Sequence, residues 1–257
     1  MHCKVKVVVP IYKEILGEKE LASLKNNARI LSQFPVVILA PEGLDVSNTL
    51  KEVPQCSVMY VSKEWLGKNG IAGYNRMMLS RSFYEMFEDC TYILICQTDA
   101  WVFSNDLEKW CNGGYDYVGA PWPKRKRYDF PPIKFFMWIR KKMLHKEGKI
   151  MRQDYFHKVG NGGFSLRKID SFIKACDTYK ERIAEFNCNT GMLYNEDWFW
   201  ALVPKEFKYP SFNDALNFSF DSHPKLCMEL NKGKLPFGCH GWFKKRNYNF
   251  WKTYIEK

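Results

Sequence analysis

The sequence predicts an α/β fold in which a mainly parallel central sheet is flanked by helices. Continuous apolar runs at residues 5–10, 35–40 and 92–96 are typical of strands that are covered on both faces. Segments with apolar residues at helical spacing lie between these runs. Because strands alternate with helices, we expect parallel strands joined by right-handed crossovers.

The expected elements are, in chain order, a strand at 5–10, a helix over 21–31, strands at 35–40 and 58–61, a helix over 72–87, a strand at 92–96 and a helix from about residue 168. The expected helices over 21–31 and from about residue 168 carry their apolar residues on one face. In open sheets of this kind, ligands bind beyond the carboxyl ends of the strands. Pro10, Tyr12, Glu42 and Asp99 are therefore expected to surround one crevice.

The composition favours one domain over residues 1–257. Apolar residues make up 46% of the chain and aromatic residues 16%, which is enough for a sizeable core and excludes global disorder. The nine cysteines are scattered without CxxC spacing, so they predict neither a zinc ribbon nor a redox dithiol. The start of the chain lacks the pattern of a signal peptide. We expect a reducing, cytoplasmic location.

The net charge of +11 favours anionic partners, and the positive charge is concentrated in one segment. Residues 124–152 hold eleven Lys or Arg and two carboxylates, and they enclose the apolar run 135–139. That run is too short to cross a bilayer, which needs roughly 20 apolar residues. Basic residues beside Trp and Phe suit a segment at the inner face of a membrane. The alternative is a solvated basic loop whose aromatic side chains lie in the core.

Asp99 is the first candidate functional residue. It follows a buried strand directly, in Gln97-Thr98-Asp99, and is expected to face the crevice. A hard cation bound there would bridge the phosphates of a nucleotide, because carboxylate and phosphate oxygens are the ligands that Mg²⁺ and Mn²⁺ prefer. The alternative is a turn aspartate that caps the following segment.

The segment 159–167 contains Gly160, Gly162 and Gly163 around Asn161. Three glycines in four residues indicate unusual dihedral angles or the close approach of another group. The segment matches neither a P-loop nor a dinucleotide-binding motif. A bulged strand that lets a substrate touch the backbone is the interpretation we favour over a tight turn.

Two further motifs lie towards the C-terminus. Glu196 and Asp197 precede a dense aromatic run, which predicts the first turn of a buried helix, where the helix dipole favours carboxylates. One of the two acids would alternatively accept a proton from an attacking hydroxyl. His240 stands between Cys239 and Gly241 and would supply an imidazole to a metal held by Asp99, although a lone histidine is more often structural.

Together and in this order, these segments resemble the GT-A class of glycosyltransferases. More narrowly, they resemble a bacterial family of uncharacterised GT-A-like proteins found with capsule and O-antigen clusters. The resemblance runs from residue 7 to Trp242 and covers nearly the whole chain. It implies a nucleotide-sugar-binding half at 1–103 and an acceptor-binding half at 104–257, with a basic and aromatic insertion at 123–153.

The resemblance also implies roles for single residues. In GT-A enzymes a DxD motif holds a divalent ion, Mn²⁺ or Mg²⁺, against the donor diphosphate, and this chain retains only the last acid, Asp99. A C-terminal histidine often completes the metal shell, which corresponds to His240. The implied donor is a UDP-sugar, and its implied contacts are Pro10, Tyr12, Asn75, Arg76, Thr98 and Asp99.

For the acceptor side, the resemblance implies an inverting, metal-assisted hexosyltransferase of polysaccharide biosynthesis. In inverting members the second acid of a Glu-Asp pair that opens a helix is the base, which corresponds to Asp197 beside Glu196. The acceptor would be a hydroxyl of a glycan or of a lipid-linked sugar. The residues expected to border the sugars are Gly162, Gly163, Trp198 and Trp242.

Three alternatives stay open. A sugar-phosphate nucleotidyltransferase would carry a glycine-rich basic loop after the first strand, whereas residues 10–14 contain no glycine. A nucleic-acid-binding module would spread its basic residues along an exposed face among stacking aromatics. In this chain they are concentrated in residues 124–152, so no nucleic acid is expected as a partner. A catalytically inactive sugar-binding relative is the third, because Asp99 stands without a second acid in its motif.

Overall fold

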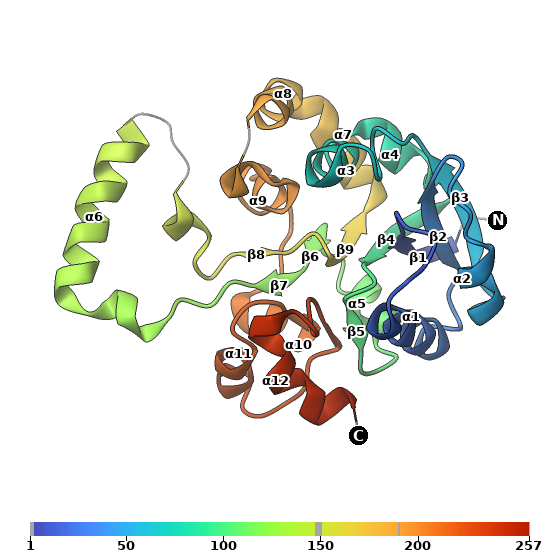
Figure 1. The fold of residues 1–257 in the computed structure, drawn as a ribbon. Coiled ribbons are helices and arrows are strands. Elements are labelled where there is room, and N and C mark those ends of the chain that lie inside the picture. Colours follow the sequence, from blue (N-terminus) through green and yellow to red (C-terminus); the bar gives the residue numbers. More distant parts are fainter. Residues whose placement is uncertain (1–2, 147–150, 190, 257) are drawn as a thin grey trace.

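The computed structural model describes residues 3–146, 151–189 and 191–256 (Figure 1). The first half contains β1 (Cys3–Pro10), α1 (Glu18–Ile30), β2 (Val36–Pro41), α2 (Ser47–Glu52), β3 (Ser57–Val61), α3 (Gly70–Met78), α4 (Arg81–Glu85), β4 (Cys90–Cys96), β5 (Trp101–Val102), α5 (Leu107–Asn112), β6 (Tyr117–Val118) and β7 (Ala120–Pro121). Residues 147–150 of the basic segment lie outside the described residues.

The second half begins with the insertion, which consists of the short helix η1 (Lys126–Asp129), α6 (Pro131–Lys146) and the short helix η2 (Arg152–Tyr155). It is followed by β8 (Val159–Gly160), β9 (Phe164–Lys168), α7 (Ile169–Thr178), α8 (Lys180–Cys188), η3 (Met192–Tyr194), α9 (Glu196–Leu202), α10 (Phe212–Phe218), β10 (Ser219–Phe220), α11 (Pro224–Leu230), β11 (Gly238–Cys239) and α12 (Lys245–Ile255).

The central sheet has six strands in the order β3-β2-β1-β4-β9-β6. The parallel pairing predicted for β1, β2, β3 and β4 is confirmed. Strands β1 to β4 pair in parallel, and β9 runs antiparallel to both β4 and β6. The sheet is therefore mainly parallel. The parallel strands bring their carboxyl ends to one edge, where the polar residues after β4 begin.

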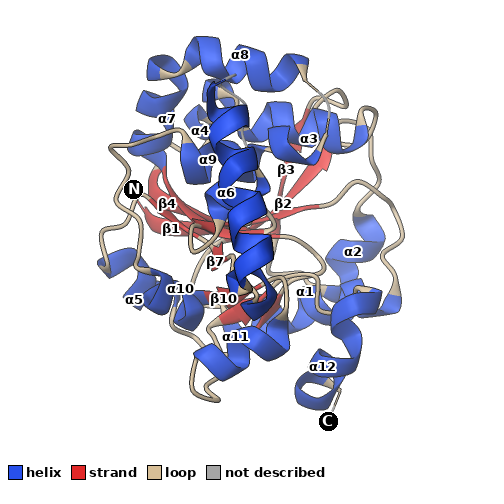
Figure 2. Ribbon diagram, turned by 90° about the vertical axis from the view of Figure 1, so that its left-hand side faces the viewer, coloured by secondary structure: helices blue, strands red, loops and turns tan. Residues whose placement is uncertain are grey.

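Helices cover both faces of this sheet (Figures 1 and 2). Successive residues of a strand point to opposite faces. Val8 accordingly packs in the layer formed by α3, α4, α7, α8 and α9, whereas Val7 and Val9 pack against α1 and α5. Strand β4 divides its side chains in the same way. Burial on both faces explains why these strands read as continuous apolar runs.

The helix expected over 72–87 is wrong in one respect, because it is divided into α3 and α4. Ser80 adopts extended backbone angles (φ −97°, ψ 130°) and separates the two helices. Serine competes with the helical backbone for hydrogen bonds, and so it favours helix ends over helix interiors. The apolar positions on either side of the break, such as Met77 and Phe83, still reach the same core layer.

A third apolar cluster lies beside the sheet and is built from the C-terminal elements. Strands β10, β11 and β5 form a small sheet in which β11 pairs with both neighbours. Trp242 and Trp251 are fully buried there and join α12 to this sheet. The cluster places the residues that follow β10 and β11 next to those that follow β4.

Gly119 connects β6 to β7 at a point where two backbone segments meet. A Cβ atom at this position would lie 1.9 Å from the carbonyl oxygen of Gly160. Strand β7 pairs with β8 at this place, with Ala120 opposite Gly160. The pairing therefore depends on the absence of a side chain at residue 119.

We expect Gly119→Ala to lower the free energy of unfolding by about 2–3 kcal/mol, because the methyl group must push the two backbones apart. Urea unfolding followed by circular dichroism measures the change. Gly17→Ala is the matched control, since Gly17 has ordinary angles and its added Cβ would meet only the flexible Glu20 carboxylate at 3.2 Å. Equal stability of the two variants would contradict the prediction.

Candidate functional site

Polar side chains follow β4 at the carboxyl edge of the sheet. Gln97, Thr98 and Asp99 are half-buried, and the Gln97 amide N–H donates to the Gly163 carbonyl at 2.9 Å. This bond ties the turn after β4 to the glycine segment before β9. The Thr98 hydroxyl lies 3.5 Å from a Glu20 carboxylate oxygen, at the start of α1.

The two predicted metal ligands, Asp99 and His240, lie side by side. His240 follows β11, and its Nε2 atom is 3.0 Å from Asp99 Oδ1. The Gln97 Oε1 atom lies 3.1 Å from the same nitrogen. Lys244, one turn further along the chain, places its Nζ atom 2.9 Å from Asp99 Oδ2. The site is therefore a cluster of two acceptor oxygens around one imidazole nitrogen.

The other side of the His240 ring is fixed by Asp221 and Asn161. The His240 Nδ1 atom lies 3.0 Å from Asp221 Oδ1 and 3.1 Å from Asn161 Nδ2. Because a carboxylate only accepts hydrogen bonds, we assign a proton to Nδ1, which donates it to Asp221. With this assignment the Asn161 amide nitrogen, which is also a donor, lies beside Nδ1 without a hydrogen bond to it. Asp221 follows β10, so the parallel pairing of β10 with β11 places donor and acceptor together.

This proton assignment leaves Nε2 facing two oxygen atoms that also only accept. The conflict is removed either by a second proton on the ring or by a cation between the three atoms. Burial alone would lower the pKa of His240, but the charge of Asp99 and the hydrogen bonds to Asp221 and Asp99 raise it to about 9. Burial likewise opposes ionisation of Asp99, yet His240 and Lys244 outweigh it and lower the pKa of that carboxyl.

The donor set of Gln97, Asp99 and His240 fits a divalent ion. Adjacent ligands of an octahedral Mg²⁺ are about 3.0 Å apart, since each lies at about 2.1 Å from the ion. The observed separations from His240 Nε2 are 3.0 and 3.1 Å. A carboxylate on the other ring nitrogen is the usual support of a metal-binding histidine. Among the described residues, no three His, Cys, Asp or Glu side chains are placed to hold a metal together. The third proposed ligand here is instead the side-chain amide oxygen of Gln97.

Asp197, in the first turn of α9, is the candidate proton acceptor. Its Oδ1 atom accepts a hydrogen bond from the Trp198 amide at 3.0 Å. Burial and the nearby charges of Glu196 and Asp221 raise the pKa of Asp197 to about 7. A carboxyl group with this pKa exchanges its proton at neutral pH, which is the property that general-base catalysis needs.

The adjacent Glu196 has a different environment. It is buried and forms an ion pair with Arg167 of β9, with 3.1 Å between Nη2 and the carboxylate oxygens. Burial raises the pKa of Glu196, and the charge of Arg167 opposes this. Arg167 also donates to the Tyr84 hydroxyl at 2.9 Å and to the Ser165 hydroxyl at 3.1 Å. The pair fixes α9 to the central sheet.

The glycines of the segment 159–163 make room for these side chains. A Cβ atom on Gly162 would lie 1.8 Å from Glu196 Oε1, and one on Gly163 would lie 2.1 Å from His240 Nε2. Asn161, at φ 88°, ends β8, and its side-chain oxygen accepts from the amides of Gly163 and Phe164. The expected bulge is thus a turn between β8 and β9, and the groups that approach its backbone belong to the protein itself.

The residues expected to contact the nucleotide sugar differ in whether a ligand can reach them. Pro10 is buried at the end of β1, whereas Tyr12 is exposed in the loop after it. Asn75 of α3 caps α9, because its Oδ1 accepts from the Glu196 amide at 3.3 Å and its Nδ2 donates to Asn195 at 3.1 Å. Arg76 is half-buried on the same helix. Asn75 therefore has a structural partner, and Tyr12 and Arg76 keep surface that a ligand can reach.

Trp198 and Trp242, which were expected to border the sugars, pack against other side chains of the protein. Trp242 is 1% exposed, and its Nε1 donates to Ser23 at 2.7 Å. Trp198 is 5% exposed and lies 3.9 Å from Tyr155, measured between ring centroids. The expectation that both rings border the sugars is therefore corrected, because at 5% and 1% exposure they belong to the core beside the site.

Sequence reasoning missed several residues of the cluster. Gln97 occupies the first position of the Gln97-Thr98-Asp99 motif, and its spacing of two from Asp99 was a usable signal. Lys244 stands four residues after His240, which also suggested a shared site. Asp221 and Arg167 gave no local signal. The pairing of β10 with β11 brings Asp221 to His240, and the packing of α9 beside β9 brings Glu196 to Arg167.

Comparisons with known proteins agree on the fold. The family model described as "Protein of unknown function (DUF5672)" matches residues 55–240. No curated protein matches the chain. Among solved structures, the galactosyltransferase LgtC in complex with donor and acceptor sugar analogs has a TM-score of 0.59 at 12% identity, covering 98% of this chain and 94% of that chain.

Two further structures are similar. Mouse xyloside xylosyltransferase 1, in its apo form, has a TM-score of 0.54 at 10% identity, with 93% of this chain and 97% of that chain covered. The bifunctional glycosyltransferase WbbM has a TM-score of 0.57 at 11% identity, with 93% of this chain and 46% of that chain covered. The chain has the GT-A glycosyltransferase fold, as the sequence predicted.

We expect opposite stability effects from two neighbouring substitutions. The folded pKa of Asp197, about 7, lies above its unfolded value of 3.8. Below about pH 4 both states hold the proton. As the pH rises to 7 only the unfolded chain loses it, so stability falls. Asp197→Asn keeps the neutral form and should stabilise the protein by on the order of 2–4 kcal/mol above pH 7, with no gain below pH 4.

Glu196→Gln is the matched control for this prediction. It leaves the buried Arg167 charge without its partner and should lower stability by about 3 kcal/mol at neutral pH. Urea unfolding of both variants at several pH values measures the two effects. A shift of the same sign in both variants at pH 8 would refute the different environments assigned to the two acids.

Proposed function

This chain belongs to the family described as DUF5672, and we propose that it is a glycosyltransferase that moves a sugar from a nucleotide sugar to a hydroxyl group. The observation that carries the proposal is the cluster at the carboxyl edge of the sheet. There Gln97, Asp99 and His240 offer a cation site, and Asp197 offers a proton acceptor. The GT-A fold supports the same class of reaction. Residues 1–103 would bind the donor, and residues 104–257 the acceptor.

Gln97, Asp99 and His240 would hold the divalent ion, Mn²⁺ or Mg²⁺. When bound, such an ion offsets the negative charge of a departing nucleoside diphosphate. His240 must give up its Nε2 proton to act as a ligand, so ion binding releases a proton. Lys244 is exposed beside Asp99 and is able to pair with a phosphate in the same place. Arg76 is proposed as a second phosphate partner.

Asp197 is proposed as the general base. It would take the proton from the acceptor hydroxyl as that oxygen attacks the anomeric carbon, and the bond to the diphosphate breaks in the same step. A single displacement of this kind inverts the anomeric configuration. Glu196 acts as a positioning residue, since its pairing with Arg167 holds the first turn of α9. Gly162 and Gly163 are proposed to border the donor and acceptor sugars through the backbone atoms that Glu196 and His240 leave uncovered.

Several finer features belong to the same proposal. The donor is proposed to be a UDP-linked hexose, and the acceptor a glycan or a lipid-linked sugar. The product would enter a surface polysaccharide such as a capsule. The enzyme would act in the cytoplasm, in peripheral contact with an anionic membrane through residues 124–152, and without a nucleic-acid partner.

We expect Asp197→Asn to lower kcat at least about 100-fold while leaving the Kd for the nucleotide within about twofold, because the base acts on the acceptor and not on the donor. A panel of nucleotide sugars with Mn²⁺, scored for donor hydrolysis and transfer, identifies the donor first. Asp99→Asn is the comparison and should weaken ion-dependent donor binding at least about tenfold. Transfer by Asp197→Asn at the parental rate would show that the base is another group.

We expect Gln97→Glu to tighten divalent-ion binding about tenfold, because a charged oxygen replaces a neutral one among the three proposed ligands. Isothermal titration with Mn²⁺ alone measures the effect without any turnover. Gln33→Glu, which adds the same charge at an exposed position beyond α1, is the control and should leave ion binding unchanged. Weaker or unchanged binding by Gln97→Glu would place the ion elsewhere.

A further inference from the structure

Helix α6 stands apart from the rest of the molecule. It belongs to the insertion between β7 and β8, and Figure 1 shows it at the far left, away from the central sheet and its helices. Figure 2 shows the same helix running along the face that is turned to the viewer. No helix in the described part of the chain is both long enough and apolar enough to cross a bilayer. Any membrane contact of α6 therefore takes place along its side.

The side of α6 that carries its large apolar residues is exposed. Phe135, Phe136 and Met143 are 61%, 64% and 63% exposed, and Ile139 lies between them at 38%. At 100° per residue these four side chains share one face of the helix. The alternative in which the aromatic side chains of this segment lie in the core is therefore wrong for Phe135 and Phe136. The apolar face points outward, which is the reverse of a helix that packs on its own protein.

The opposite side of α6 faces the protein. Met137 and Leu144 are half-buried there. Lys141, on the same side, places its Nζ atom 3.1 Å from Asp154 Oδ1 at the other end of the insertion. The ion pair and the two half-buried side chains thus lie on the side of α6 opposite the exposed apolar face.

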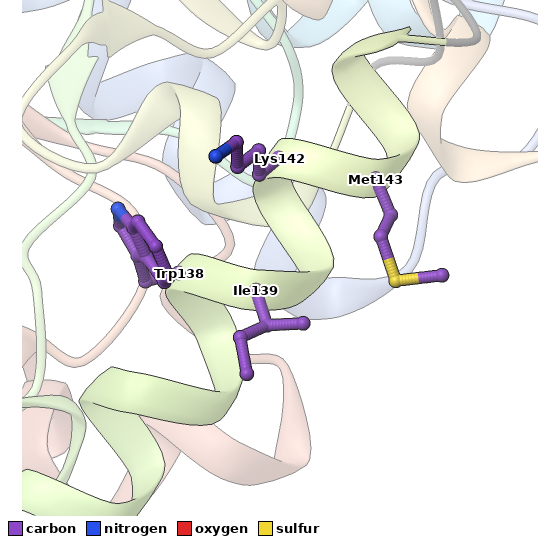
Figure 3. A pocket seen from close by; sticks show the side chains of 4 residues that line it. All are labelled: Trp138, Ile139, Lys142 and Met143. Carbon is purple, nitrogen blue, oxygen red and sulfur yellow. The ribbon is translucent and has the colours of Figure 1, made fainter.

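Basic side chains flank the exposed face. Lys142 lies over the Trp138 ring at 5.5 Å, and Arg140 stands on the other edge of the apolar face. Trp138, Ile139, Lys142 and Met143 line a pocket of about 220 Å³. Figure 3 shows these four side chains on α6. The basic residues between 124 and 144 are Lys124, Arg125, Lys126, Arg127, Lys134, Arg140, Lys141 and Lys142, and the single acid in that range is Asp129, which pairs with Lys124.

We propose that α6 is a docking helix that lies in the headgroup region of an anionic bilayer, with Phe135, Phe136, Ile139 and Met143 inserted. Exposed aromatic and aliphatic side chains beside Lys and Arg have the composition of interfacial helices. A second copy of this chain would bring the same positive charges together, which repel each other. A nucleic acid would use the charges and leave the apolar face in water. An anionic membrane satisfies both features at once.

The two ends of the insertion, at Trp122 and Tyr155, pack against the helix that carries the proposed base. The Trp122 ring, which follows β7, lies 4.7 Å from Tyr155 and 6.1 Å from Trp198. Trp198 is next to Asp197 in α9. If the proposed function holds, the docked helix brings the base to the membrane surface, and the acceptor is an amphiphile presented there. The docking surface itself does not depend on that function.

Sedimentation with lipid vesicles tests the docking surface without any enzymatic assay. We expect the chain to bind vesicles of phosphatidylcholine mixed with phosphatidylglycerol, and to lose most binding as salt rises from about 0.05 to about 0.5 M, because the Debye length shortens. Phe135→Ser with Phe136→Ser should weaken binding at least about tenfold. Arg140→Glu with Lys142→Glu should do the same at low salt.

Matched controls keep the test specific. Tyr60→Ser with Leu230→Ser removes two other exposed apolar side chains, and Lys225→Glu with Lys234→Glu reverses two other exposed charges. Both should bind like the parent, and circular dichroism with thermal unfolding should show all variants folded. Equal binding by the α6 variants and the parent, or binding to phosphatidylcholine alone at the same strength, would each overturn the proposal.

Discussion

The close approach of side chains to the backbone at Gly162 and Gly163 is the constraint on which the site depends. Glu196 meets this backbone from α9, and His240 meets it from the loop after β11. Each would collide with a methyl group there. The turn between β8 and β9 thus sets how near the helix with Asp197 comes to the carboxylate after β4. Neighbouring bonds keep the turn in place, since Asn161 accepts from two of its amides and Gln97 donates to Gly163.

Around that turn the electrostatic environments differ over short distances. Asp99 and Asp221 share one imidazole between them, and the arrangement favours their charged forms. The environment of Asp197 is different, because burial and the charges of Glu196 and Asp221 favour its neutral form. One carboxylate is therefore suited to hold a cation and another to exchange a proton. Separation of pKa values in this way is the general means by which a site assigns different tasks to the same chemical group.

The sequence predicted those features that local patterns encode. Apolar runs located β1, β2 and β4, and helical spacing located α1 and α7 within a few residues. Motif order brought Asp99 and His240 into one hypothesis, and the fold places them 3.0 Å apart. Local patterns could not reveal that Asp221 supports His240 or that Arg167 neutralises Glu196, because each contact joins segments that are distant in sequence. Aromatic density was equally ambiguous, since Trp242 packs inside whereas Phe136 is exposed.

The short ladder of β7 and β8 closes immediately before and after the insertion that carries α6. Residues 122–158 leave and re-enter the fold at neighbouring points, and the strands of the central sheet pair without them. Trp122 and Tyr155 near its two ends are buried in the core, whereas a change in the length of the surface connection between them adds little closure entropy. The fold therefore tolerates insertions of different length between β7 and β8 without a change in the pairing of the central sheet.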